Sequence, residues 1–180
     1  MKKSFFVLVA FLFLLGGAGS LLAQPFQNGS FEVGPTDIGS FVTLYTADMS
    51  IPGWTVESGS IDLIGAYWIA SDGLRSIDLS GQEPGGISQT FDTEQGQWYL
   101  VQFDMAGNPD SGVLKVLLAS VGDPEAATFE YEFDSTGKTS SDMGWETISF
   151  TFMAEGPATK IMFKRLTEGP WGPGVNPILS

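Results

Sequence analysis

Two short stretches, FEYEF at residues 129–133 and TISFTF at residues 147–152, decide the fold. In both, aromatic or aliphatic residues alternate with polar residues. Side chains in an extended strand point alternately to opposite faces, so this period of two places the apolar groups on one face. The two stretches therefore predict half-buried antiparallel strands.

Two further runs, WYLVQFDM at 98–105 and VLKVLLA at 113–119, are apolar at neighbouring positions. This pattern predicts central strands that are apolar on both faces. Turn signals rich in Gly, Pro, Asn and Asp separate the runs at spacings of roughly ten residues. Because no amphipathic helix pattern is present, the sequence predicts an all-β, antiparallel β-sandwich or jelly roll.

The N-terminus has the order of a secretory signal: two lysines, an apolar run and small residues before Gln24. We predict a signal peptide at 1–23 and a single β-sandwich domain at 24–180, and we expect a secreted protein in the extracellular space, at the cell surface or in the periplasm. Leu21 is large for its place before the cut, so an uncleaved anchor or an earlier cut stays open as an alternative. The chain has no cysteine, so packing, hydrogen bonds or a metal must supply the stability.

The net charge of the chain limits the classes of partner that it is expected to bind. The formal net charge is −13, and removing Lys2 and Lys3 lowers it to −15. Such a surface repels phosphate backbones and anionic lipid, so we expect no nucleic-acid partner and no membrane contact in the mature form. Neutral ligands or cations fit better, while solubility alone is the alternative explanation.

The absence of His and Cys excludes triads, dyads and histidine-based zinc sites. Catalysis by carboxylates stays open. Asp62 and Asp78 could form the pair of a glycosidase, or Asp104 or Glu146 could supply an acid. Because a small sandwich offers little to surround a sugar ring, we expect no enzyme. Loop Asp and Asn residues could ligate calcium, or they could simply form turns.

The phrase S-I-D-L occurs at 60–63 and again at 76–79. Its apolar residues are two apart and should face the core, so Asp62 and Asp78 should point the other way. The spacing is too short for known repeat architectures. Two strands that end in glycine turns are the simpler interpretation.

Between these strands lies the best functional signal, a loop that contains Tyr67, Trp68, Asp72 and Arg75. The flat rings could stack on a pyranose while Asp72 and Arg75 hydrogen-bond its hydroxyls. The alternative is that Trp68 closes the end of the sandwich as part of the core. The sequence leaves both interpretations open.

Four segments together resemble the choice-of-anchor C family, which is related to a plant cell-wall family of galactose-binding-like domains. The segments are NGSFEVG at 28–34, IPGWTVESGSIDLIGAYW at 51–68, DGLRSIDLSGQEPGGISQTFDTEQGQWYLVQFDMAGNP at 72–109 and GWETISFTFMAEG at 144–156. The resemblance covers nearly all of the predicted mature chain. It implies a galactose-binding-like jelly roll that is associated with polysaccharide.

The resemblance also implies a structural calcium ion held by Asn28, Glu32 and a closing acidic residue. At that last position the chain has Asn176, followed by Pro177, which lowers the expected calcium affinity because an amide carries no charge. The chain continues only to Ser180, so we expect surface retention, if any, by something other than a C-terminal anchor.

The sequence thus predicts a secreted, non-catalytic carbohydrate-binding or cell-surface matrix protein whose partner is a polysaccharide or glycan. The first alternative is an exported structural domain that contacts proteins and has no glycan affinity. The second is a small carboxylate-based glycoside hydrolase.

Overall fold

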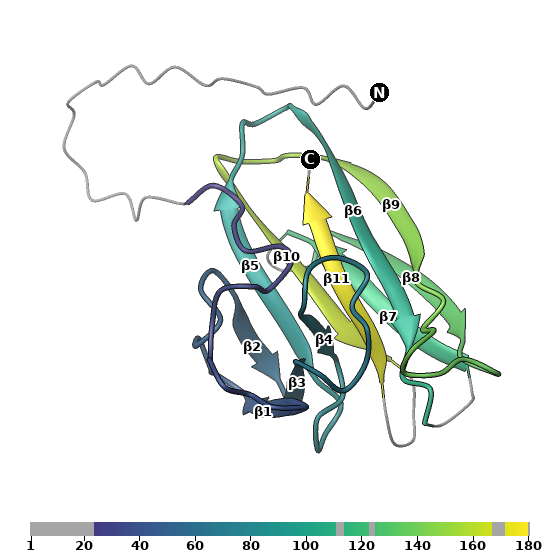
Figure 1. Cartoon of the computed structure of the whole chain (residues 1–180). Helices are drawn as coiled ribbons and strands as arrows, with labels where there is room; N and C mark the ends of the chain where they lie inside the picture. The colour runs from purple at the N-terminus through teal and green to yellow at the C-terminus, as the bar shows by residue number, and fades with distance from the viewer. Residues whose placement is uncertain (1–23, 111–113, 123–124, 167–171, 180) are drawn as a thin grey trace, which may run out of the picture.

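The computed structural model describes residues 24–110, 114–122, 125–166 and 172–179, and the side chains of 176–179 lie outside this description. The predicted signal peptide, residues 1–23, also lies outside it. The described part contains eleven strands and no helix (Figure 1). The strands are β1 (Phe41–Tyr45), β2 (Thr55–Ser58), β3 (Ser60–Ile64), β4 (Ser76–Asp78), β5 (Gly86–Asp92), β6 (Trp98–Gly107), β7 (Leu114–Val121), β8 (Ala127–Asp134), β9 (Glu146–Met153), β10 (Ala158–Arg165) and β11 (Pro173–Leu179).

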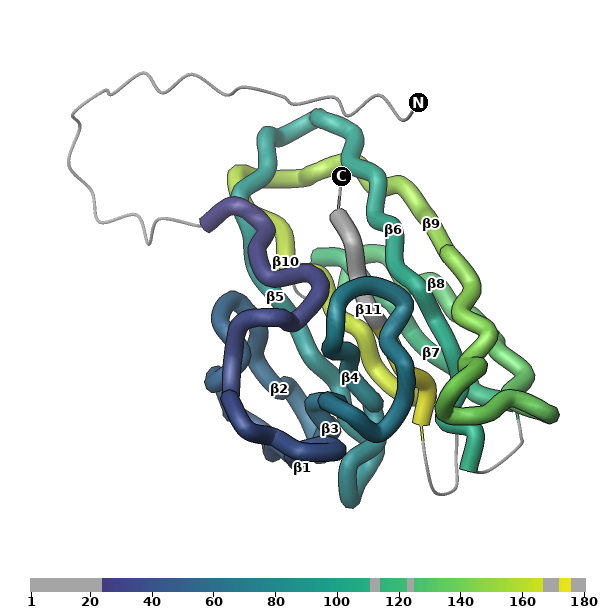
Figure 2. The backbone as a smooth tube through the Cα atoms, in the orientation of Figure 1, coloured from purple at the N-terminus to yellow at the C-terminus, as the bar shows by residue number. Residues whose placement is uncertain are grey.

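The strands form two antiparallel sheets that pack face to face (Figures 1 and 2). The first sheet has the order β1-β3-β4-β11-β6-β9, and the second has the order β2-β5-β10-β7-β8. Neighbouring strands are often distant in sequence, as in a jelly roll. The predicted all-β antiparallel sandwich is confirmed.

Each stretch that decided the fold is a strand. FEYEF lies within β8 and TISFTF within β9, and both strands show the expected alternation of exposed and less exposed side chains. The two S-I-D-L phrases form β3 and β4, with Asp62 directly opposite Asp78 in the sheet. β8 and β9 were predictable because each buries only one of its faces, which sets a period of two.

The core lies between the sheets and is rich in aromatic rings. Phe103 of β6 meets Phe163 of β10 across the sandwich, with ring centroids 5.0 Å apart. Trp54 lies 6.3 Å from Phe163 and 5.2 Å from Phe31, again between centroids. Large buried rings remove much apolar area from water, which stabilises a domain without disulfides.

One prediction is wrong for β6, the strand expected to be buried on both faces. Its inward residues Val101 and Phe103 are 1% and 0% exposed, whereas its outward residues Trp98 and Leu100 are 68% and 36% exposed. The loop that covers the outer face of this sheet, residues 65–75, lies over β3 and β4 instead. The apolar side chains of Trp98 and Leu100 in β6 therefore face outward.

In the described ranges, no helix is long and apolar enough to cross a membrane.

Candidate ligand-binding site

The loop of residues 65–75 joins β3 to β4 and folds back onto the outer face of the first sheet. The indole Nε1 of Trp68 donates a buried hydrogen bond of 2.8 Å to the hydroxyl of Ser76, and the residue is only 4% exposed. A side chain added at Gly174 of β11 would meet the Trp68 ring at 3.4 Å. Trp68 is therefore buried, as the second interpretation expects, but it packs against the outer face of the first sheet and does not close the end of the sandwich.

Tyr67 lies beside Trp68 and is half-buried. Its ring packs edge-on against Phe41, with centroids 5.6 Å apart, and at 5.7 Å from the Trp68 ring. Its hydroxyl donates a short hydrogen bond to the Asp110 carboxylate. This bond, with burial next in importance, raises the pKa of Tyr67 to about 12, so the hydroxyl stays protonated at neutral pH.

Glu32 holds the loop from the side. One of its carboxylate oxygens, Oε1, accepts hydrogen bonds from the backbone N–H of Leu74 at 2.8 Å and of Arg75 at 2.9 Å. These two bonds fix the segment before β1 next to the loop, and the two segments lie side by side in Figure 2. Gly73 has a φ of +66°, which favours glycine, and an added Cβ would meet the Glu32 carboxylate.

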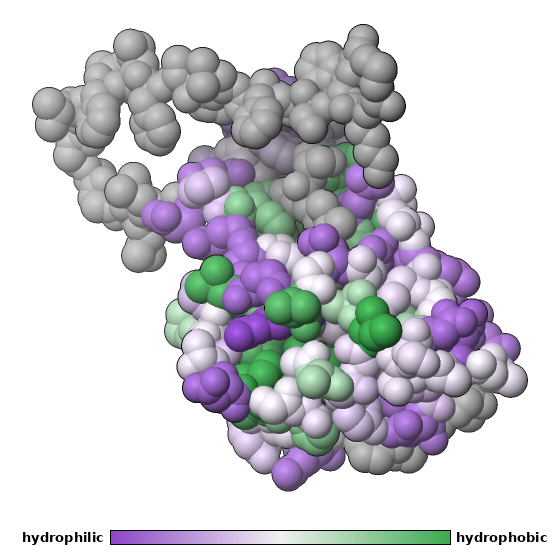
Figure 3. Space-filling view, viewed as in Figure 1, coloured by the Kyte–Doolittle hydropathy of each residue, from purple (hydrophilic) through white to green (hydrophobic). Residues whose placement is uncertain are grey.

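A cleft of about 380 Å³ opens between this loop and residues 140–141. Tyr67 and Trp68 line it, together with Ile69, Leu74 and the serines at 140 and 141. Asp72 and Arg75 do not line it, although both belong to the same loop; Asp72 is exposed and Arg75 is half-buried. The structure thus brings two of the four predicted ligand residues to one cleft. Figure 3 shows several separate apolar patches on this face, set among polar side chains.

The calcium ligands implied by the resemblance are engaged elsewhere. The side-chain oxygen of Asn28 accepts the N–H of Val33 at 3.0 Å, and its amide nitrogen donates to the carbonyls of Val33 and Pro52. Glu32 accepts the two loop N–H groups, and the Asn176 side chain lies outside the description. Among the described residues, no three His, Cys, Asp or Glu side chains gather as metal ligands do. Asn28 and Glu32 are thus both held by hydrogen bonds to backbone groups, and the calcium site stays a prediction.

Asp62 and Asp78 face outward from the sheet, as predicted, but the loop covers them. They are 7% and 1% exposed and line a cavity of about 60 Å³ beneath Tyr67 and Trp68. Burial raises the pKa of Asp62 despite a 2.6 Å hydrogen bond from Thr43. A pair in so small a cavity cannot surround a sugar ring, so it does not suit glycoside hydrolysis.

Burial also raises the pKa of Asp78, to about 7. The Asp62 carboxylate adds to this rise, while a hydrogen bond of 2.9 Å from Asn108 and the cations of Arg165 and Lys115 oppose it. The other oxygen, Oδ1, is buried without a hydrogen-bond partner among the described residues. The carboxyl group is thus held where its neutral form is favoured.

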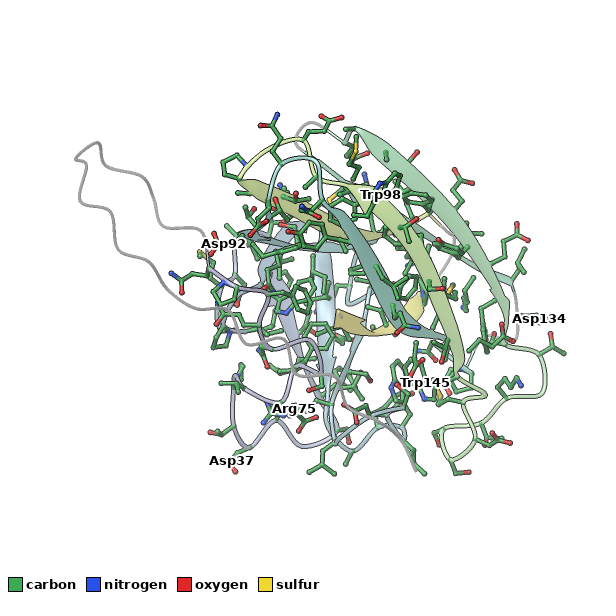
Figure 4. The ribbon with its side chains drawn as sticks, turned by 90° about the horizontal axis from the view of Figure 1, so that it is seen from above. Asp37, Arg75, Asp92, Trp98, Asp134 and Trp145 are labelled. Carbon is green, nitrogen blue, oxygen red and sulfur yellow. The ribbon has the colours of Figure 1, made fainter. Side chains whose placement is uncertain are left out.

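A larger cleft, of about 550 Å³, lies at the end of the sandwich where β6, β8 and β10 begin. Trp98, Phe129 and Phe152 are its aromatic residues. The consecutive apolar residues in 98–105 predict burial on both faces, and that prediction leaves no cleft here. The available signal was the alternation itself: Trp98 and Leu100 share the face opposite Tyr99 and Val101. Trp98 lies well away from Arg75 in Figure 4.

The architecture and its clefts define a jelly-roll β-sandwich of the kind found in carbohydrate-binding modules. The solved structure of TmCBM61 in complex with β-1,4-galactotriose shows this likeness, with a TM-score of 0.50 and 18% identity over 87% of this chain and 97% of that chain. A family 35 carbohydrate-binding module from an environmental isolate matches with a TM-score of 0.49 and 13% identity, over 82% and 90% of the two chains.

Residues 24–179 match the family described as "Protein of unknown function (DUF642)", so the chain belongs to that family. Halomucin of Haloquadratum walsbyi is 34% identical over 184 residues, which cover 97% of this chain. The chain spans 2% of the length of Halomucin. The narrower resemblance to the choice-of-anchor C family stays a prediction.

Proposed function

We propose that this protein is a secreted, non-catalytic carbohydrate-binding domain. The observation that carries the proposal is the cleft of about 380 Å³ beside the 65–75 loop, where the Tyr67 ring and two serine side chains line the same hollow. An aromatic ring next to a few hydroxyls is the lining that suits one sugar unit. TmCBM61, which shares the fold, was solved with β-1,4-galactotriose.

The roles within the loop follow from the burial of each side chain. Tyr67 contacts the sugar with the part of its ring that stays open, and Trp68 supports Tyr67 from below instead of offering a face of its own. Asp72 and Arg75 belong to the same loop but do not line the cleft, so the proposal assigns them no direct contact with the sugar unit in it. The hydroxyl of Tyr67 is already bonded to Asp110, so stacking rather than hydrogen bonding is the contribution of Tyr67.

The test is binding of the chain from Gln24 to Ser180 to a broad panel of oligosaccharides and polysaccharides, followed by calorimetry on the best ligand. Tyr67→Ala should weaken binding of a short oligosaccharide by about tenfold. Tyr45→Ala is the matched control, because Tyr45 is 52% exposed on β1 and does not line the cleft. Absence of binding across the panel, by protein with a cooperative unfolding transition, would overturn the proposal.

A second candidate function, a domain that contacts proteins, is favoured by the exposed apolar residues around the same loop. Ile69 and Leu74 of the loop, and Val33 next to Glu32, are each at least 60% exposed. Exposed apolar groups that lie together often mark protein interfaces. This candidate predicts no glycan affinity and either self-association or capture of a protein partner.

A further inference from the structure

The outer face of β6 and β9 carries a regular row of side chains. In the antiparallel register, Trp98 lies opposite Met153, Leu100 opposite Thr151, Gln102 opposite Ser149, and Asp104 opposite Thr147. Because side chains alternate between faces, these four pairs share the outer face, while Tyr99, Val101 and Phe103 face the core. We call the four pairs the β6–β9 strip.

The strip changes in character along its length. At one end Trp98 and Met153 are 68% and 50% exposed. Toward the other end the side chains are amide, hydroxyl and carboxylate groups, and Thr147, Ser149 and Thr151 are all exposed. The strip spans six residue steps, about 20 Å at a strand rise of about 3.3 Å per residue. It is therefore long enough for several consecutive sugar units.

The apolar end of the strip runs into the cleft of about 550 Å³. Trp98, Thr151 and Met153 belong to both, and Phe129 and Phe152 complete the aromatic lining. The volume lies in the range of small-molecule sites. The strip and the cleft thus form one continuous surface.

The charges of this surface select the ligand. The chain has 21 acidic residues, yet in the strip the only charged group is Asp104, whose carboxylate accepts the Thr147 hydroxyl at 2.6 Å. In the cleft the charged groups are Glu155 and Lys160, and Lys160 pairs with Glu57 at 2.9 Å. A surface with no net positive charge on an acidic protein suits an uncharged ligand and disfavours an anionic one.

We infer that the β6–β9 strip and its cleft bind an extended, uncharged polysaccharide along the chain. Trp98 stacks on one sugar ring, and Gln102, Ser149 and Thr151 hydrogen-bond the hydroxyls of the units that follow. This inference rests on the proposed carbohydrate binding and assigns it a second surface and a class of ligand. The loop cleft accommodates one sugar unit, whereas the strip binds an internal stretch of a linear chain.

The experiment measures binding of β-1,4-galactan and other uncharged linear polysaccharides, with polygalacturonate as the anionic comparison. Trp98→Ala should weaken binding of the uncharged chain by at least about tenfold, and Thr151→Arg, which places a long side chain across the strip, by a similar factor. Tyr45→Ala again serves as the exposed-ring control. Both strip variants should keep the wild-type unfolding midpoint, because their side chains face solvent.

Three results support the inference: loss of binding in both strip variants, affinity that rises with oligosaccharide length, and weak binding of polygalacturonate. If Tyr67→Ala abolishes binding of the polysaccharide while Trp98→Ala and Thr151→Arg do not weaken it, the strip assignment is wrong and the proposed function stands. Absence of any glycan binding by the folded protein overturns both. Self-association that Trp98→Ala removes, with no polysaccharide affinity, would show instead that the strip binds a second copy.

Discussion

Two tryptophans in this protein differ in exposure in the opposite way to what their local secondary structure suggests. Trp68 lies in a loop between two turns and is 4% exposed, whereas Trp98 begins a strand in the interior of a sheet and is 68% exposed. The loop folds back and places Trp68 over β4, where its indole N–H finds a buried hydroxyl. Alternation along the strand places Trp98 on the outer face, where no loop of the described residues buries it. Exposure therefore follows which face is covered, and not whether a residue lies in a loop or a strand.

The largest effect that separates the two regions is on stability. Trp68→Ala removes a buried ring and a buried hydrogen bond, and should lower the free energy of unfolding by about 3–5 kcal/mol. Trp98→Ala should change it by no more than about 0.5 kcal/mol, because its ring faces solvent. Urea denaturation of both variants measures the difference. Equal losses in the two variants would show that Trp98 also packs in the core.

The acid pair beneath the loop should make the stability of the protein depend on pH. The folded-state pKa of Asp78 is about 7, above the value of about 3.9 in an unfolded chain, so the folded protein holds a proton that the unfolded chain releases. The free energy of unfolding should therefore fall as the pH rises from about 4 to about 7, and it should level off above that. The total fall is ~1.4 kcal/mol for each unit by which the folded-state pKa exceeds the unfolded-state pKa. Asp62, whose pKa is also raised, contributes with the same sign.

Asp78→Asn should remove most of this dependence. The amide is neutral at every pH, and its oxygen can still accept the hydrogen bond from Asn108. Relative to wild type, the variant should become more stable as the pH rises toward 8, measured by urea denaturation at pH 5 and pH 8. Asp104→Asn, on the exposed strip, is the matched control and should leave the slope unchanged. A wild-type slope that persists in Asp78→Asn would place the titrating group elsewhere.

A third, smaller effect concerns how the loop is held. Glu32→Ala removes the acceptor for the N–H groups of Leu74 and Arg75, which should cost about 1–3 kcal/mol. Hydrogen exchange at these two amides should accelerate, while exchange in β6 and β9 should not. Glu83→Ala, at another exposed glutamate, is the control. Faster exchange across the whole sandwich would mean that the segment before β1 stabilises the fold as a unit.

Much of the fold could be predicted from the sequence, because strands with one buried face show a period of two, as β8 and β9 do. The outward direction of Asp62 and Asp78 followed from the same rule. Their burial did not, since it depends on a loop that folds back across the sheet through contacts such as Glu32 with Leu74, 42 residues apart. The exposure of Trp98 was missed for the converse reason, because a run of apolar residues does not reveal whether its second face is covered.

The smallest expected effect is that of calcium. The resemblance implies a calcium site at Asn28, Glu32 and Asn176. One side-chain oxygen of Asn28 and one of Glu32 already accept backbone N–H groups, and these bonds hold the segment before β1 beside the loop. Removing calcium with a chelator should therefore leave the unfolding midpoint and glycan affinity unchanged, whereas Asn28→Ala should lower the midpoint with or without the chelator. If calcium raises the unfolding midpoint of wild type and not of Asn28→Ala, Asn28 is a metal ligand. The structure around the loop would then depend on an ion as well as on packing, unlike the β6–β9 strip.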